Sequence, residues 1–335
     1  MALRQRSIRT SGLVVSIGAV LALTACGGDD AFNDEDPGST PEPSASEGET
    51  EGSAAPGGEL TIGGAAFTEM LIMQEIYAAV LTDAGYTVEI ISVENRETYA
   101  PELESGGLDI VPDYAATFTE YLNVEDNGPE AELIANGAIG ETLRAFRALA
   151  EPRGLVVLDA ADAANQNAFF VTEAFATENA LATLSDLSAL GQPLVLAATV
   201  ECPERPFCEP GLEETYGLDI TEVIPLGYGS LETKQAVTTG EAQLGLSGTT
   251  DATLAAEGLV VLDDDADLQL ADNLTPVVNA ETLAEHPDIE ELLNAVSGAL
   301  TTEILADLNQ RVDVDRELPA DVAAAFLEEA GLVGG

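Results

Sequence analysis

The chain has 335 residues, with 61 Asp and Glu against 11 Lys and Arg, and so a formal charge of −50 at pH 7. This balance excludes nucleic acids and anionic lipid surfaces as partners, because phosphate contacts need many basic side chains. The single histidine, His286, also removes most histidine-based catalysis and polyhistidine metal sites. A hydrophobic fraction of 46% indicates one or two folded domains with a large core.

The first 25 residues have the layout of a signal peptide. Arg4, Arg6 and Arg9 precede an apolar run, Leu13–Leu23, that is short for a membrane span. The run ends in Leu-Thr-Ala followed by Cys26, which resembles a lipobox, where cleavage precedes a cysteine that then carries lipid. We therefore expect a lipidated Cys26, with a plain secretory signal or a short anchor as the alternatives.

Residues 26–57 continue as an acidic segment rich in Gly, Ser, Pro and Thr. Such a composition cannot bury enough apolar area to offset the entropy of ordering, so the sequence predicts a disordered tether behind the lipidated cysteine. The folded part is expected to begin near Glu59.

Strands and helices alternate over residues 60–111. Met73, Ile76, Tyr77, Val80 and Leu81 recur at the spacing of one helix face. Thr68 is the expected N-cap of that helix. Further elements are expected as strands at 60–63, 87–93 and 108–111 and as a helix at 98–105.

A second region repeats this order, with strands at 194–198, 221–225 and 243–246 and a helix at 231–239. In both regions a helix, a glycine and a strand lead into a loop that carries polar residues. Alternation of this kind indicates α/β lobes with parallel sheets, and ligands bind such sheets at the carboxyl ends of the strands. Two similar lobes therefore predict a ligand cleft between them.

Cys202 and Cys208 bracket a short Pro-rich loop. Outside the cytoplasm so close a pair is expected to form a disulfide that stiffens the loop. A metal site is the alternative, which the lack of a nearby histidine disfavours. We expect no metal and no cofactor.

Several collinear segments resemble the osmoprotectant-binding proteins of ABC importers, which take glycine betaine, choline, carnitine and proline betaine. The first is Ile62-Gly-Gly-Ala-Ala-Phe-Thr-Glu69, and the resemblance spans roughly residues 60–333. The other segments are 107–117, 204–217, 249–251, 259–264 and 301–314.

The resemblance implies a two-lobe periplasmic-binding-protein-like fold of type II. Two crossovers are expected near 162–165 and 247–250, with lobe 1 formed by 58–164 plus 250–335 and lobe 2 by 165–249. The implied function is an extracytoplasmic solute receptor, lipid-anchored on the outer face of the cytoplasmic membrane, that serves a permease and an ATPase on separate chains. The implied ligand is a small zwitterionic or cationic osmolyte.

By the same resemblance, Tyr114 matches a tyrosine of the cage that holds a quaternary ammonium, and Thr117 matches the adjacent polar contact. Arg205 matches the arginine expected to clamp a ligand carboxylate from the second lobe. The alternatives are a half-buried loop tyrosine for Tyr114 and simple pairing with neighbouring acids for Arg205.

The chain departs from the family pattern at several site positions. Ala65 stands where the family has lysine, while Ala168, Lys234 and Gly248 stand where it has cage tyrosines. The ligand is therefore not determined by the resemblance.

Other aromatic and polar residues are candidates to replace the missing groups. Phe67, Phe169 and Tyr228 are the expected cleft aromatics, with Tyr99 and Tyr121 as further candidates. Asn165 is expected either to bind ligand or to cap the crossover, and Asp251 either to contact a cation or to cap the following helix. We expect Tyr77, Tyr86 and Tyr216 to be structural.

Two other functions remain open at this point, a sensory or regulatory lipoprotein of the same fold and a receptor for a different small polar solute. An enzyme is disfavoured because the sequence has no Ser-His-Asp set, phosphate-binding loop or metal-ligand cluster.

Overall fold

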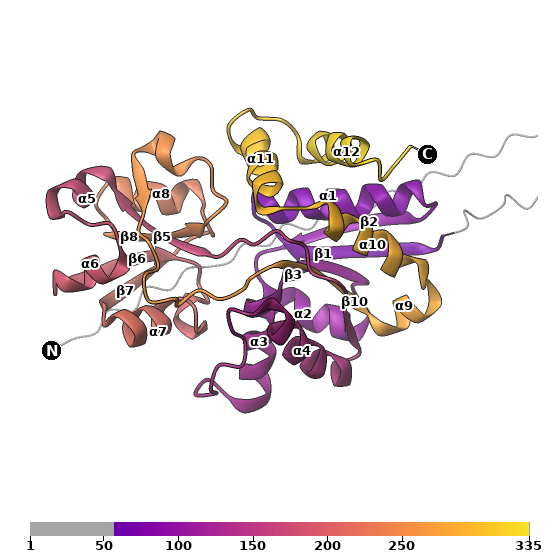
Figure 1. Ribbon diagram of the computed structural model, residues 1–335, viewed down its shortest axis with the longest axis horizontal. Helices are drawn as coiled ribbons and strands as arrows, with labels where there is room; N and C mark the ends of the chain where they lie inside the picture. Colours follow the sequence, from indigo (N-terminus) through magenta and orange to yellow (C-terminus); the bar gives the residue numbers. More distant parts are fainter. Residues whose placement is uncertain (1–56, 335) are drawn as a thin grey trace, which may run out of the picture. The chain divides into compact units, whose positions relative to one another are not determined.

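A computed structural model describes residues Gly57–Gly334, which lie within one compact unit (Figure 1). The expected signal peptide, Cys26 and tether fall outside the described residues. Within residues 57–334, every helix is too short or too polar to cross a bilayer.

The first sheet has five strands in the order β2-β1-β3-β10-β4. β1 pairs in parallel with β2 and β3, whereas β10 runs antiparallel to β3 and β4. The strands are β1 (Glu59–Ala65), β2 (Thr87–Val93), β3 (Ile110–Tyr114), β4 (Leu155–Val157) and β10 (Leu274–Asn279).

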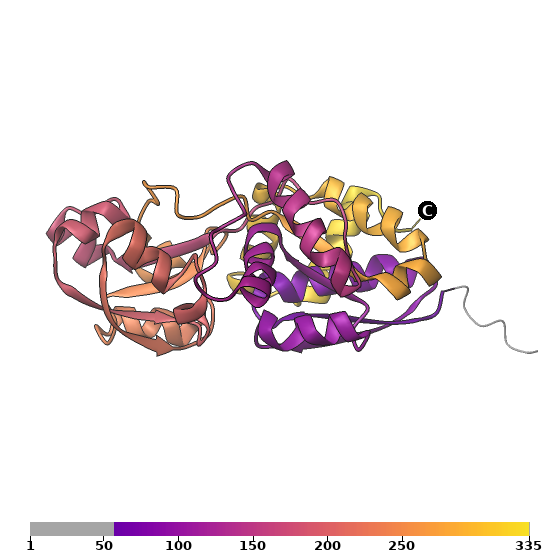
Figure 2. The same ribbon diagram turned by 90° about the horizontal axis from the view of Figure 1, so that it is seen from below.

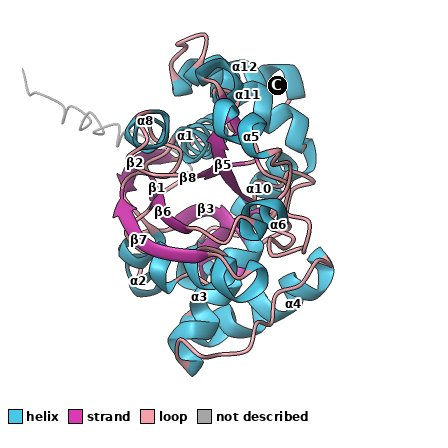
Figure 3. Cartoon of the chain, turned by 90° about the vertical axis from the view of Figure 1, so that its left-hand side faces the viewer, coloured by secondary structure: helices cyan, strands magenta, loops and turns pink. Residues whose placement is uncertain are grey.

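Helices lie on both sides of the strands, as Figure 3 shows. The expected helix is present as α1 and is buried on more than the one predicted face, and its N-cap is Phe67 rather than Thr68. The Thr68 hydroxyl instead donates to Oδ1 of Asp313 at 2.7 Å. The helices of this lobe are α1 (Thr68–Asp83), α2 (Arg96–Ser105), α3 (Ala115–Asn127), α4 (Ile139–Ala150), α9 (Ala280–Glu285), α10 (Asp288–Ala299), α11 (Thr302–Asp313) and α12 (Pro319–Ala330).

The second sheet has the same number of strands in the order β7-β6-β8-β5-β9, again with parallel neighbours on one side and antiparallel ones on the other. Its strands are β5 (Asn167–Thr172), β6 (Pro193–Ala198), β7 (Asp219–Pro225), β8 (Leu244–Gly248) and β9 (Leu259–Val261). Its helices are α5 (Glu173–Asn179), α6 (Leu184–Ala189), α7 (Glu209–Gly211) and α8 (Leu231–Thr238).

Each sheet has its own buried core, so the described chain forms two lobes. Two segments connect them, one between β4 and β5 and one between β9 and β10 (Figures 1 and 2). These segments meet at an antiparallel bridge between Ala164 and Asn273.

The second connection lies later in the chain than the expected 247–250. After β8 the chain makes a short 3-10 turn, Leu254–Glu257, and then adds β9 to the exposed edge of β5. Val261 pairs with Phe170 and Leu259 with Thr172, so residues 250–261 belong to the second lobe and the crossover follows them. The expected position of the second crossover is therefore wrong. Without β9, one edge of β5 would have no hydrogen-bonded neighbour, so the chain adds this strand to the second lobe before it crosses.

Candidate functional site

A cavity of about 570 Å³ is lined by residues of both lobes. It collects the carboxyl ends of parallel strands, with Phe67 following β1, Tyr114 ending β3, Thr199 following β6 and Tyr228 following β7. This is where α/β sheets bind ligands, since side chains from several loops converge there. The expected cleft is therefore present.

Tyr114 lies on the cavity wall and is held by a buried carboxylate. The residue is 8% exposed, and its hydroxyl donates to Oε1 of Glu69. Burial and the negative charge of Glu69 raise the pKa of the Tyr114 hydroxyl well above its usual range. The side chain is thus a neutral donor with a fixed orientation.

Glu69 joins segments that are far apart in sequence. Asn165 donates to its Oε1 at 3.0 Å from the first connection, while Thr250 and Asn309 each donate to its Oε2 at 2.6 Å. Burial raises the pKa of Glu69, and the four hydrogen bonds act in the opposite direction. Sequence analysis missed this role, since only the family-like segment at 62–69 marked Glu69 at all.

Aromatic rings from both lobes meet in the cavity. Phe67 of the first lobe and Tyr228 of the second have ring centroids 5.0 Å apart at an interplanar angle of 50°. Tyr99 and Tyr121 also line the cavity. Aromatic faces attract a delocalised cation, so this corner provides the chemistry for a quaternary ammonium.

Phe169 does not line the cavity. It is 1% exposed in β5 and packs in the core of the second lobe, while the next residue, Phe170, packs in the cluster on the other side. Successive side chains of a strand point to opposite faces, and both faces of β5 are covered. The expectation of a cleft aromatic at Phe169 is therefore corrected.

Thr117 lies in the first turn of α3, within a buried polar network. Its hydroxyl accepts from Nη2 of Arg96 at 2.8 Å, and its backbone N–H donates to Oδ1 of Asp272 at 3.0 Å. Arg96 in turn binds both carboxylate oxygens of Asp113, at 2.9 and 2.5 Å. Thr117 lines the cavity but is committed to this network.

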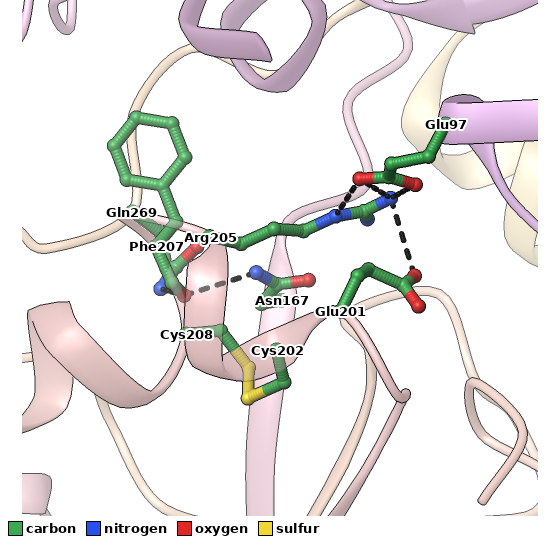
Figure 4. The surroundings of a disulfide bond; sticks show 8 residues. All are labelled: Glu97, Asn167, Glu201, Cys202, Arg205, Phe207, Cys208 and Gln269. Atoms are coloured by element: carbon green, nitrogen blue, oxygen red, sulfur yellow. Dashed lines mark hydrogen bonds and ion pairs between the residues drawn. A yellow bond between two sulfur atoms is a disulfide. The ribbon is translucent and has the colours of Figure 1, made fainter. Parts of the chain in front are cut away.

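Arg205 reaches from the second lobe to the first (Figure 4). Its guanidinium binds Glu97 at the start of α2, with contacts of 2.9 to 3.2 Å, and lies 3.2 Å from Glu201. Partial burial acts to raise the pKa of Glu97, but the charge and hydrogen bonds of Arg205, together with a backbone hydrogen bond and the charge of Arg96, lower it overall. Pairing with neighbouring acids, the alternative left open for Arg205, is what the structure contains.

The loop that carries Arg205 is closed by the predicted disulfide between Cys202 and Cys208 (Figure 4). Because both sulfur atoms are bonded to each other, neither is available as a thiolate ligand for the metal site considered as the alternative. Asn167 and Gln269 donate to the backbone carbonyl of Phe207 at 3.1 and 2.9 Å. The loop is therefore fixed by the disulfide and by two side-chain hydrogen bonds to its backbone.

Lys234 lines the cavity, whereas Asp251 lies behind it. Nζ of Lys234 is 2.7 Å from Oδ2 of Asp251, and the other carboxylate oxygen accepts from the backbone N–H of Thr253. Burial acts to raise the pKa of Asp251, but the bonds from Lys234 and Ser247 lower it. Asp251 thus holds Lys234 and accepts from the backbone two residues on, but it does not cap a helix, because the following 3-10 turn has Thr253 as its N-cap and no side-chain cap.

Asn165 occupies the space that a side chain at Gly248 would need. A Cβ at Gly248 would lie 2.4 Å from Oδ1 of Asn165. Asn165 lines the cavity and donates to Glu69, which ties the first connection to the first lobe, while ligand binding by Asn165 stays a prediction. Tyr77, Tyr86 and Tyr216 lie outside the cavity, as expected of structural tyrosines.

Acidic side chains outnumber basic ones on the cavity wall, ten to four. The described residues hold no cluster of His, Cys, Asp and Glu suited to a metal ion. The wall therefore offers aromatic faces and negative charge, a combination that favours a cation.

Comparison with known proteins identifies relatives over nearly all of the described residues. A family model for the substrate binding domain of the ABC-type glycine betaine transport system matches residues 58–329. A glycine-betaine-binding protein of Pseudomonas aeruginosa is 30% identical over 285 residues, which cover 82% of this chain and 88% of the relative. The glycine betaine-binding protein YehZ of Escherichia coli is 28% identical over 283 residues, 81% of this chain and 90% of the relative.

Solved structures support the fold. A crystal structure of a glycine betaine/carnitine/choline ABC transporter protein matches with a TM-score of 0.60 at 22% identity, covering 82% of this chain and 98% of the other. The two-lobe, type II binding-protein fold expected from the sequence is confirmed.

Proposed function

The chain belongs to the family of substrate-binding domains of ABC-type glycine betaine transport systems, and from this premise we propose that it captures a small quaternary amine between its lobes. The family consists of solute receptors rather than enzymes. The observation that carries the proposal is that Tyr114 lines the same cavity as the packed pair of Phe67 and Tyr228, and that most charged residues of this cavity are acidic.

A quaternary ammonium has no N–H to donate, so its recognition depends on aromatic faces and on charge. Phe67 and Tyr228 come from opposite lobes and pack against each other, so a ligand that packs on this ring pair stabilises the arrangement in which the two lobes are close. Closure excludes water and strengthens the electrostatic contacts. The closed receptor would then present a distinct surface to a permease with its ATPase.

A thermal-shift screen tests the ligand class. Choline, glycine betaine, proline betaine and carnitine form the panel, with ectoine and amino acids alongside. The matched control is 3,3-dimethylbutan-1-ol, which has the shape of choline without its charge. We expect at least one quaternary amine, and not the neutral alcohol, to raise the melting temperature. No shift with any quaternary amine would exclude this ligand class.

We also propose that lipid on Cys26 holds the receptor at the outer face of the cytoplasmic membrane. The support is the sequence of the first 26 residues. In detergent phase partition of cell extracts, the native protein should enter the detergent phase, and Cys26→Ala should remain in the aqueous phase. Equal partition of the two proteins would contradict lipidation.

A further inference from the structure

Three of the four bases on the cavity wall are already bound to carboxylates of the protein. Arg96 is 5% exposed and binds both oxygens of Asp113. Its guanidinium carbon also lies 5.3 Å from the centre of the Phe118 ring. A buried bidentate pair of this kind leaves no free charge for a ligand.

Lys234 is neutralised in the same way within the second lobe. Its ammonium group lies 2.7 Å from Asp251 and donates to the hydroxyl of Thr253 at 2.6 Å. Both side chains of the ion pair are less than a tenth exposed. A ligand carboxylate would have to compete with Asp251 inside the protein.

Arg205 is the base best placed to meet a ligand carboxylate, and it lies between two acids. It forms three hydrogen bonds to Glu97 and an ion pair with Glu201. One guanidinium beside two carboxylates leaves a local excess of negative charge. The fourth base, Arg316, is exposed, so solvent screens its charge.

Most acidic side chains of the cavity wall, by contrast, have no basic partner in the described part of the chain. Seven of them form no ion pair within residues 57–334, namely Glu94, Glu120, Glu125, Glu204, Glu257, Asp272 and Asp313. Glu94, Glu125, Glu204 and Glu257 are exposed, so solvent screens their charges as it screens that of Arg316. Glu120, Asp272 and Asp313 are buried or half-buried, so on the shielded part of the wall carboxyl groups without an ion-pair partner still outnumber free bases.

We propose that this cavity selects a quaternary amine that carries a net positive charge and no carboxylate, an amino alcohol of the choline kind, over zwitterionic betaines. The inference rests on the proposed function and specifies its ligand. A trimethylammonium group gains from the aromatic corner in either ligand. A betaine carboxylate must in addition either displace Glu97 from Arg205 or lie near acidic side chains without a basic partner. Either outcome makes the free energy of binding less favourable.

Choline and glycine betaine test this directly, because they share the trimethylammonium group and differ at the other end. In isothermal titration calorimetry at low salt, choline should bind at least tenfold more tightly than glycine betaine. The affinity for choline should also fall as salt rises, since part of it is electrostatic. Equal or tighter binding of glycine betaine would overturn the inference and leave the proposed function standing. Absence of binding by the whole quaternary amine panel would overturn both.

Glu97→Gln releases Arg205 from its strongest partner and should raise the affinity for glycine betaine. We expect the choline-to-betaine preference to fall at least fivefold. The matched control is Glu89→Gln, which removes the same charge at an exposed position on β2 and should leave the preference unchanged. Glu201→Gln provides a second variant with the same expected direction. An unchanged preference in both Glu97→Gln and Glu201→Gln, with unchanged melting temperatures, would overturn the inference.

Discussion

The hydroxyl of Tyr114 donates a hydrogen bond to Glu69, a carboxylate that is only 2% exposed. Through the same carboxylate, Tyr114 is linked to Asn165 on the first connection and to Thr250 beyond β8. A residue on the cavity wall is thereby tied both to one of the two connections and to the second lobe.

Replacing Glu69 should affect the whole network. In Glu69→Gln one acceptor becomes an N–H₂ group that faces side-chain donors, and buried donors lose their partner. We expect the free energy of unfolding to fall by about 1–3 kcal/mol. Urea denaturation measures it, with Glu75→Gln as a control on the same helix. Equal stability of the two variants would contradict a central role for Glu69.

The ring of Tyr114 should contribute directly to ligand affinity. Tyr114→Ala removes the aromatic face and should weaken quaternary amine binding by about 1–2 kcal/mol, the range of a largely desolvated cation–π contact. Tyr114→Phe retains the ring and should bind more tightly than the alanine variant. Calorimetry compares the two, and unchanged affinity in Tyr114→Ala would remove Tyr114 from the site.

Asp272 should make stability depend on pH. Burial raises the pKa of its carboxyl from 3.8 to about 7, against the amide hydrogen bonds from Thr117 and Ala116 and the charge of Arg96. A carboxyl with a raised pKa in the folded state stabilises the protein fully below the unfolded pKa. That contribution is lost as pH rises from about 4 to about 7.

Asp272→Asn keeps the oxygen that accepts from the backbone of α3 but cannot ionise. The stability of the native protein should therefore fall relative to Asp272→Asn over this pH range, by up to about 1.4 kcal/mol per pH unit. Chemical denaturation at several pH values gives the difference, in which groups common to both proteins cancel. Parallel stability curves would show that Asp272 does not titrate in this window.

The disulfide should contribute moderately because the loop that it closes is short. Cys202 and Cys208 are separated by six positions, for which loop-closure entropy gives about 2 kcal/mol. The double variant Cys202→Ser, Cys208→Ser should lose about that much unfolding free energy, and reduction of the native protein should match it. Peptide mapping under non-reducing conditions should recover the two cysteines joined; two alkylated thiols would refute the bridge.

Local features of the sequence predicted most of the elements. The apolar spacing that ends at Leu81 gave α1, and the short runs at 194–198 and 221–225 are β6 and β7. These succeeded because helix faces and short buried strands follow from neighbouring residues. The cysteine pair was equally accessible, since the two residues are only six positions apart.

Site prediction was less complete because it depended on distant pairings. Phe67 and Tyr228 were expected in the cleft and line it. The prediction that Phe169 also lies there was wrong, because the residues of β5 alone do not indicate that other segments cover both faces of this strand. The position of the second connection was missed for a related reason. A three-residue strand is recognisable only by the edge that it completes.

The sequence by itself determined the charge, the two α/β lobes, the family and the short loop carrying Arg205, because each follows from composition or from residues close together in the chain. Only the tertiary structure decided which charged side chains form ion pairs with each other. Arg205 meets Glu97 across 108 positions, and Asn309 meets Glu69 across 240. Pairing over such distances depends on how the two sheets and their connections bring the loops together, and it determines whether a cation or a carboxylate finds a partner in the cavity.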